Sequence, residues 1–138
     1  MIAHILIVDA DGNAARVTAA IIARVVPVAT LAVEPTVEGG RRRVQEQAPD
    51  MLLLDLSPNQ RADDCLIREV KARNAHALVI ALTARSARSA LRQFPERQID
   101  RYVAKGCEPE LLVRALRDAV QQGLLLQANS SCIDRSLV

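Results

Sequence analysis

The sequence is poor in aromatic residues and cysteine and has no long apolar run. Phe94 and Tyr102 are the only aromatic residues among 138, so the core must be aliphatic. The three cysteines are widely separated and fit no metal-ligand spacing, which favours free thiols in a reducing compartment. No apolar stretch approaches the roughly 20 residues of a membrane-spanning helix, and the N-terminus lacks the basic region of a signal peptide. We therefore expect a cytoplasmic protein without a membrane segment.

The charge of the chain is nearly balanced. Eighteen basic and sixteen acidic side chains leave a formal net charge of +2, too little to predict binding to nucleic acid or to an anionic membrane. The arginine-rich stretch 39–47 has no aromatic stacking residue nearby, so a solvated helix face is the favoured interpretation. Half of the residues are apolar, which excludes a disordered chain and predicts a single folded domain.

Short apolar runs alternate along the chain with segments of helical periodicity. This alternation predicts an α/β fold, a doubly wound parallel sheet with helices on both faces. We assign residues 1–123 to this domain and 124–138, which show no period, to a C-terminal tail or linker stub. The pattern predicts strands over 3–9, 28–33, 51–55, 77–83 and 101–105, and helices over 12–26, 36–48, 64–73, 84–94 and 108–123.

Four chemically active side chains stand at the ends of these strands. They are Asp9, Asp55, Thr83 and Lys105, following the first, third, fourth and fifth strands. Singly, each fits an ordinary role such as a helix cap, a packed hydroxyl or a solvated charge. Parallel strands end at one edge of the sheet, and ligands of doubly wound folds bind there. The four side chains together therefore predict a functional site.

The motifs at these strand ends resemble those of the receiver domain of two-component response regulators. The resemblance covers about residues 3–122 and is carried by "ILIVDAD", "DMLLLDLS", "ALTA" and "YVAKG". It implies the flavodoxin-like strand order 2-1-3-4-5 in a five-stranded parallel sheet. It also implies a signalling protein of a phosphorelay, a phosphoprotein rather than an enzyme.

What the resemblance implies for the site is phosphoryl transfer. Asp55 would be the phosphoacceptor, taking a phosphoryl group from a sensor histidine kinase or a phosphotransfer protein. Lys105 would pair with one phosphoryl oxygen. Thr83 would bind another through its hydroxyl and move inward, and Tyr102 would follow it as the second switch residue.

The same resemblance implies Mg²⁺ as a cofactor. Its ligands would be Asp9, Asp55 and the backbone carbonyl of Ser57, with Asp11 as a further candidate. Ala10 stands where the family usually has the acid that touches the metal, so we expect weak Mg²⁺ affinity. A second departure from the family pattern is Asp63, which replaces a glycine usual at the start of the next helix.

These departures leave two functions open. In the first, the domain is phosphorylated on Asp55 and switches a protein-interaction face. In the alternative, it is a degenerate pseudo-receiver that acts as a phosphorylation-independent interaction or dimerisation module. The retention of Asp55, Thr83, Tyr102 and Lys105 favours the first.

The expected partners follow from the resemblance as well. They are a downstream protein target or a fused output domain, and a second copy bound through the face of helix 84–94, strand 101–105 and helix 108–123. The chain is either a stand-alone receiver or the N-terminal part of a longer regulator. The sequence has no glycine-rich phosphate loop and no Gly-x-Ser-x-Gly motif, which argues against nucleotide binding and hydrolase chemistry.

Overall fold

From residue 4 to residue 83, strands and helices alternate along the chain, as the sequence predicts. The computed structural model describes residues 3–83, 98–105 and 109–121. The helix expected over 84–94 lies outside the described residues, as does the tail expected over 124–138. The described elements are β1 (His4–Val8), α1 (Gly12–Val25), β2 (Thr30–Glu34), α2 (Val37–Glu46), β3 (Met51–Asp55), α3 (Gln60–Arg73), β4 (Leu78–Thr83), β5 (Arg101–Ala104) and α5 (Pro109–Gln121).

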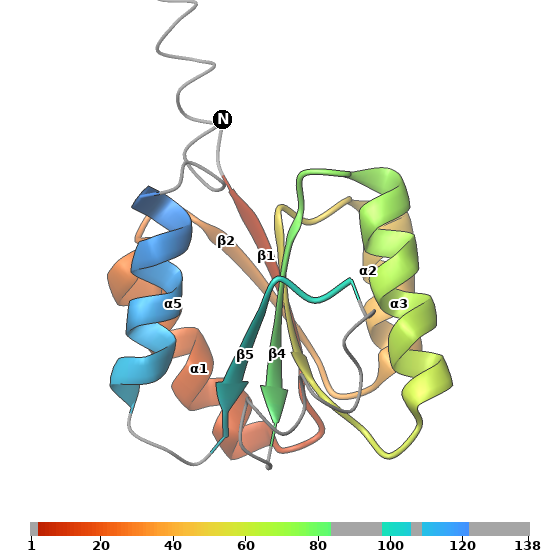
Figure 1. The fold of residues 1–138 in the computed structure, drawn as a ribbon, viewed down its shortest axis with the longest axis horizontal. Coiled ribbons are helices and arrows are strands. Elements are labelled where there is room, and N and C mark those ends of the chain that lie inside the picture. The colour runs from red at the N-terminus through yellow and green to blue at the C-terminus, as the bar shows by residue number, and fades with distance from the viewer. Residues whose placement is uncertain (1–2, 84–97, 106–108, 122–138) are drawn as a thin grey trace, which may run out of the picture.

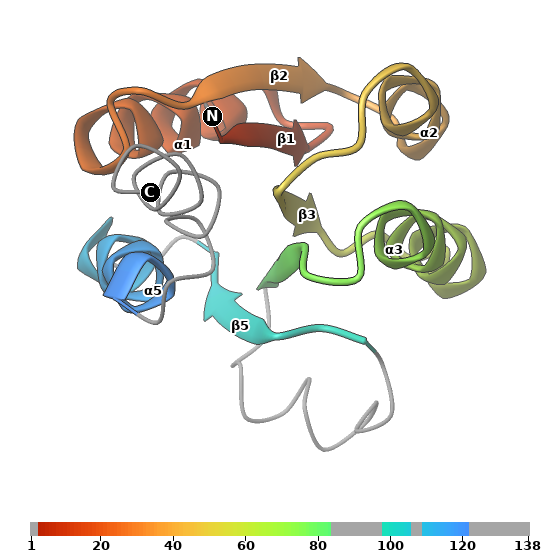
Figure 2. The ribbon, with the colours of Figure 1, turned by 90° about the horizontal axis from the view of Figure 1, so that it is seen from above.

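The five strands form one parallel sheet with the order β2-β1-β3-β4-β5, which confirms the predicted fold class. Helices α1 and α5 cover one face of the sheet, and α2 and α3 cover the other (Figures 1 and 2). Each face has its own aliphatic core cluster. Central strands buried on both sides read as continuous apolar runs, which is why "MLLL" shows no alternation. Within the described part of the chain, no helix combines the length and apolarity needed to cross a bilayer.

Two elements begin two or more residues away from the predicted position. Helix α3 begins at Gln60 instead of residue 64, because the side chain of Asn59 accepts a hydrogen bond from the Ala62 amide at 3.1 Å and caps the helix there. The Ser, Pro, Asn and Asp residues of this segment therefore belong in part to a helix start. Strand β2 begins at Thr30, two residues later than predicted.

Helix α2 forms although it contains two adjacent glycines. Gly40 is buried against β1, where a Cβ atom would lie 2.8 Å from Val8 Cγ2 and 3.4 Å from Leu66 Cδ2. The glycine thus lets the helix approach the sheet closely. Thr36 caps the same helix by accepting from the Gly39 amide at 3.0 Å, which offsets part of the low helix propensity.

Polar side chains also secure the amino-terminal edge of the sheet. The Asp50 carboxylate accepts from the His4 amide at 2.7 Å, and the Asp100 carboxylate accepts from the Val79 amide at 2.7 Å. His4 itself is 9% exposed, and its Nδ1 lies 2.9 Å from Thr30 Oγ1. These contacts satisfy backbone and ring groups that the sheet ladder leaves unpaired.

We expect Gly40→Ala to lower the free energy of unfolding by about 1 kcal/mol. The clash with Val8 and Leu66 costs about 1–3 kcal/mol, and the better helix propensity of alanine returns only about 1 kcal/mol. Gly12→Ala is the control, because a Cβ atom there has no neighbour within 4 Å. Urea denaturation of both variants measures the difference. Equal stability of the two would contradict the close approach of α2 to β1.

Protonation of His4 should destabilise the fold at acidic pH. Burial lowers the pKa of His4, an effect partly offset by Asp50 and reinforced by Arg43. The unfolded chain therefore binds the proton first, so this contribution to stability is complete above pH 6.5 and is lost as pH falls below it. His4→Gln should lose less stability than the wild type between pH 7.5 and pH 5.5, measured by denaturation at both pH values. A parallel loss in both proteins would be the contrary result, with His76→Gln, an exposed site, as the matched control.

Candidate functional site

The strand register brings Asp9 and Asp55 side by side. Val8 of β1 pairs with Leu54 of β3, so the residues that follow them, Asp9 and Asp55, end neighbouring strands. Leu82 of β4 pairs with Asp55, so Thr83 stands one position beyond it. The apolar strands thus carry the polar side chains to the carboxyl-terminal edge of the sheet, where the arrowheads lie in Figure 1.

Lys105 connects the two carboxylates. Its Nζ donates to Asp9 Oδ1 at 3.0 Å and to Asp55 Oδ2 at 2.9 Å. Its backbone amide donates to the Thr83 carbonyl oxygen at 2.5 Å, which continues the ladder between β4 and β5 beyond the last strand pair. One side chain therefore joins the ends of β1, β3 and β5, and its backbone fixes it to β4.

The two carboxylates differ in exposure. The Asp9 side chain is fully buried, whereas 23% of the Asp55 side chain is exposed. Asp9 Oδ1 also accepts from the Asp11 amide at 2.9 Å, so Asp9 is held by two donors. Of the two carboxylates, Asp55 is therefore the one that a molecule approaching from solvent can reach.

The electrostatics of this edge follow from burial and from the shared ammonium group. Burial raises the pKa of Asp55, the hydrogen bond from Lys105 opposes the rise, and the charge of Asp9 adds to it. Burial lowers the pKa of Lys105, but the hydrogen bonds and charges of Asp55 and Asp9 outweigh burial, so the net shift is upward. Lys105 therefore stays protonated at neutral pH and supplies the positive charge that the two carboxylates require.

Thr83 and Tyr102 lie on the adjacent strands. Thr83 ends β4 and is 5% exposed, and its strand partner is Ala104. Tyr102 is half-buried on β5 and pairs with Ala81, three residues before Lys105. Both residues thus belong to the strands that border the charged cluster.

The donors at this edge fit Mg²⁺ in kind but are few. Mg²⁺ binds oxygen ligands, and the edge offers the carboxylates of Asp9 and Asp55. The carbonyl of Ser57 stays a predicted ligand. Asp9 Oδ2 is buried and has no hydrogen-bond partner among the described residues, so it is available to a cation. Across residues 3–83, 98–105 and 109–121, however, no three acidic, histidine or cysteine side chains gather as a metal-binding group.

Asp11, the further candidate ligand, has a structural role in this chain. Its Oδ1 accepts from the amides of Asn13 and Ala14 at 3.0 and 3.2 Å and caps α1. A carboxylate used in this way stabilises the helix start by hydrogen bonding and by its charge at the positive end of the helix dipole. Moving Asp11 onto a cation would leave those amides without this cap.

Asp63 is the residue of this region whose role the sequence did not reveal. It is fully buried in the first turn of α3, and its Oδ2 and Oδ1 accept from the amide and hydroxyl of Ser57 at 2.9 and 3.0 Å. It therefore anchors the segment that follows Asp55 to α3. The signal available in the sequence was an aspartate at a helix start a few residues after a serine, a pattern typical of local side-chain hydrogen bonds.

The chain is similar to a known protein family and to solved structures over most of its length. The family model described as "Response regulator receiver domain" matches residues 5–117. No curated protein sequence matches. Among solved structures, the N-terminal domain of an uncharacterized protein (WS1339) from Wolinella succinogenes is 25% identical with a TM-score of 0.71, and the match covers 88% of this chain and 97% of that one.

Two further structures have the same fold at lower identity. The response regulator DrrB of Thermotoga maritima, described as an OmpR/PhoB homolog, is 22% identical with a TM-score of 0.73, and the match covers 88% of this chain and 54% of DrrB. A response regulator receiver domain protein of Clostridium thermocellum is 19% identical with a TM-score of 0.71, and the match covers 91% of this chain and 99% of that one. With the family model matching most of its length, the chain belongs to the response regulator receiver domain family.

Proposed function

We propose that this domain accepts a phosphoryl group on Asp55 from a phosphohistidine of a sensor histidine kinase or phosphotransfer protein. One observation carries the proposal: of the two carboxylates bound by Lys105, only Asp55 is open to solvent. Receiver domains take phosphoryl groups from phosphohistidine donors, so the family membership of the chain also supports the proposal. In this proposal the domain is a phosphoryl acceptor in a cytoplasmic two-component pathway and not an enzyme with a separate substrate.

The chemistry is a displacement at phosphorus. A carboxylate oxygen of Asp55 attacks the phosphorus atom, a P–O bond forms, the P–N bond to the donor imidazole breaks, and the imidazole takes up a proton. Positioning and charge neutralisation dominate such a reaction. Lys105, which lies 2.9 Å from Asp55 and 3.0 Å from Asp9, would pair with a phosphoryl oxygen.

Asp9, Asp55 and the Ser57 carbonyl would hold Mg²⁺ in this proposal. When bound, the cation supplies positive charge against the incoming phosphoryl oxygens. Asp63 accepts hydrogen bonds from the amide and hydroxyl of Ser57. The positions of metal ligands depend on supporting hydrogen bonds of this kind. Asp11 contributes to the site through its backbone amide, which donates to Asp9.

The output of the switch would use Thr83 and Tyr102. In the family's manner, the Thr83 hydroxyl binds the phosphoryl group and Tyr102 follows it inward, which reshapes the face of β5 and α5. The partner at that face would be a downstream protein, a fused output domain or a second copy of the chain. The exposure of Tyr102 is intermediate, which supports a side chain that can turn between inner and outer positions.

A second candidate function is supported by the missing acid at position 10. With Ala10 at the metal edge and Asp11 committed to the cap of α1, the site has one carboxylate fewer than the family pattern. A domain with too weak a cation site would act as a pseudo-receiver that binds partners without phosphorylation. The two functions differ in whether Asp55 is modified.

Incubation with a small phosphodonor and Mg²⁺ should add one phosphoryl group to the protein. Intact-mass spectrometry should find the adduct on the wild type and not on Asp55→Asn, because the amide cannot attack phosphorus. Asp64→Asn, which removes a charge from α3, should still be labelled. Absence of the adduct on the wild type, under conditions that label another receiver domain, would favour the pseudo-receiver.

Ala10→Asp should raise the affinity for Mg²⁺ by about ten-fold or more, because it adds a carboxylate ligand to a hard cation. Ala10 is exposed, so the larger side chain needs no repacking. Isothermal titration calorimetry measures the change. Ala20→Asp adds the same charge to an exposed position of α1 and controls for general electrostatics. An unchanged affinity in Ala10→Asp would mean that the cation does not bind at this edge.

A further inference from the structure

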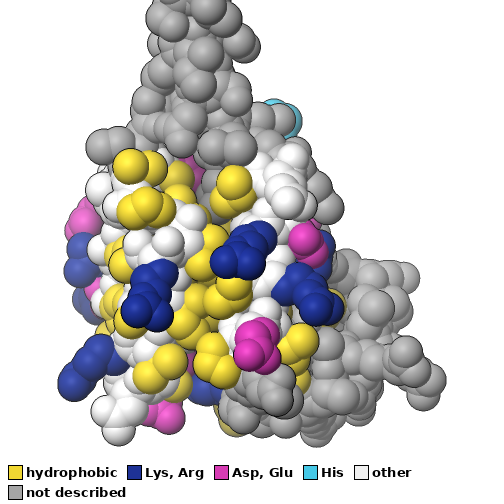
Figure 3. Space-filling model, turned by 90° about the vertical axis from the view of Figure 1, so that its left-hand side faces the viewer, with side chains coloured by type: hydrophobic (Ala, Val, Ile, Leu, Met, Phe, Trp, Pro, Cys, Tyr) yellow, Lys and Arg dark blue, Asp and Glu magenta, His cyan; other side chains and the backbone are white. Residues whose placement is uncertain are grey.

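An apolar groove runs between α1 and α5, away from the phosphoacceptor. It has a volume of about 560 Å³, and its apolar lining includes Ile21, Val25, Val113 and Val120. Arg24 and Arg117 line it as well, one from each helix. Figure 3 shows this face of the molecule, on which hydrophobic side chains lie between separate Lys and Arg side chains. We call it the α1–α5 groove.

Two arginines on the opposite face of the molecule form ion pairs. On α2, Arg41 pairs with Glu69 and Arg43 with Glu34, both at 2.6 Å. Within the described part of the chain, no ion pair is formed by the exposed arginines of α1 and α5, which are Arg16, Arg24, Arg114 and Arg117. These four arginines therefore carry positive charge that no carboxylate of the described residues pairs with.

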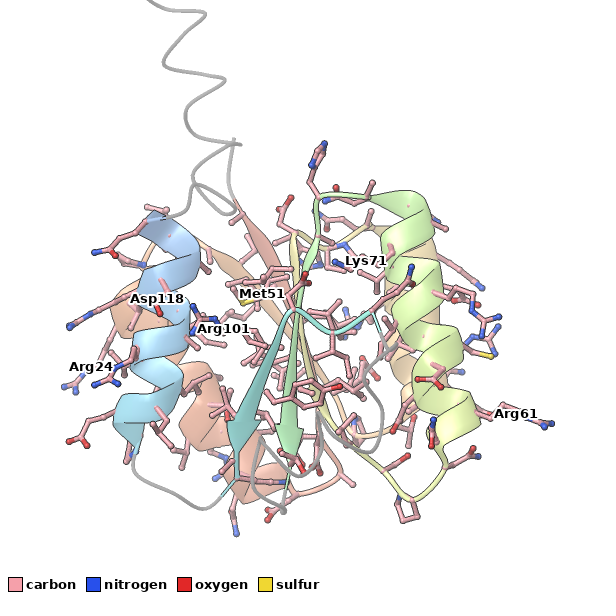
Figure 4. The ribbon with its side chains drawn as sticks, viewed as in Figure 1. Arg24, Met51, Arg61, Lys71, Arg101 and Asp118 are labelled. Carbon is pink, nitrogen blue, oxygen red and sulfur yellow. The ribbon has the colours of Figure 1, made fainter. Side chains whose placement is uncertain are left out.

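One acidic side chain of α5, Asp118, already forms an ion pair with another residue. Asp118 of α5 accepts from Arg101 of β5 at 2.9 Å, and Figure 4 shows the two side chains meeting beside α5. Glu110 stands in the first turn of α5 and is not among the residues that line the groove. A lining that combines apolar side chains with arginines that form no ion pair among the described residues is complementary to a ligand with apolar and acidic groups.

We propose that the α1–α5 groove binds an amphipathic helix of a partner protein. Its apolar side chains would enter between Ile21, Val25, Val113 and Val120, and its flanking acidic side chains would pair with Arg24 and Arg117. Helices commonly bind in this way, with apolar anchors on one face laid into a groove. The lining of the groove includes none of Asp9, Asp55, Thr83 and Lys105, so this interaction goes beyond the phosphoryl transfer proposed above.

Charge and shape favour this occupant over two others. A second copy bound through the same face would bring the arginines of one protomer against those of the other, because a two-fold interface uses the same patch twice. An anionic membrane would neutralise the arginines, but a bilayer surface meets protruding apolar side chains better than recessed ones. A protein helix satisfies the recessed apolar lining and the flanking charges together.

The test is a titration of the full chain, labelled with ¹⁵N, with two synthetic amphipathic peptides about 18 residues long, which is about five helical turns. Both peptides have a leucine stripe, flanked by glutamate in one and by lysine in the other. At low salt the glutamate peptide should bind at least about ten-fold more tightly and shift the amide signals of α1 and α5. Combined Arg24→Glu and Arg117→Glu should remove this preference.

Combined Arg42→Glu and Arg61→Glu is the matched control, since it makes the same change of net charge on α2 and α3. Arg61 points away from the body of the protein in Figure 4. All four positions are exposed, so both double variants should keep the wild-type melting temperature. The control should bind the glutamate peptide as the wild type does.

Three results would overturn the proposal. The first is no binding of the glutamate peptide, or equal binding of both peptides. The second is sedimentation of the wild type as a dimer that Arg24→Glu and Arg117→Glu dissociate, because the groove would then hold a second copy. The third is binding to vesicles of phosphatidylcholine and phosphatidylglycerol, lost in the same variant, with no binding of either peptide.

Discussion

The site depends on one ammonium group placed between two carboxylates. Lys105 lies 3.0 Å from Asp9 and 2.9 Å from Asp55, and these residues come from three different strands. Asp9 is fully buried, and a buried carboxylate without a partner costs several kcal/mol. The lysine is therefore needed for the stability of this edge as well as for its chemistry. It keeps two negative groups together where a third, the phosphoryl group, is proposed to arrive.

The residues that depart from the family pattern lie close to this edge of the sheet. Ala10 leaves the proposed cation site with one carboxylate fewer than the family pattern, and Asp11 stabilises the start of α1 instead of replacing that carboxylate. Asp63 adds a buried carboxylate on the other side, where it binds the amide and hydroxyl of Ser57. The chain thus keeps a hydrogen-bonded edge around Asp55, the proposed phosphoacceptor, with fewer carboxylates for the proposed cation. The two proposed functions differ in whether the remaining oxygen ligands bind the cation tightly enough for phosphorylation of Asp55.

Much of the fold was predictable from the sequence, because continuous apolar runs and helical periodicity alternate five times and fix a parallel sheet. The meeting of the strand ends followed from the same topology. Helix α2 was harder to predict, because Gly40 lowers the helix propensity. The close packing of α2 on Val8 explains why a glycine stands there. The predicted start of α3 was wrong because the prediction assigned Asn59 to a loop and not to a helix cap. The contact of Asp63 with Ser57 was missed because the predicted start of α3 at residue 64 left Asp63 outside the helix.

The most direct measurement of the central claim is the pattern of hydrogen bonds made by the Lys105 ammonium group. In protein labelled with ¹⁵N-lysine and ¹³C-aspartate, nitrogen–carbon couplings across hydrogen bonds report which carboxylates accept from Nζ. The structure predicts couplings from Lys105 to the carboxylate carbons of both Asp9 and Asp55, with Arg or Lys substitutions elsewhere leaving them unchanged. An ammonium group that shows coupling to neither carboxylate, and exchanges with water as a free surface lysine does, would contradict the account.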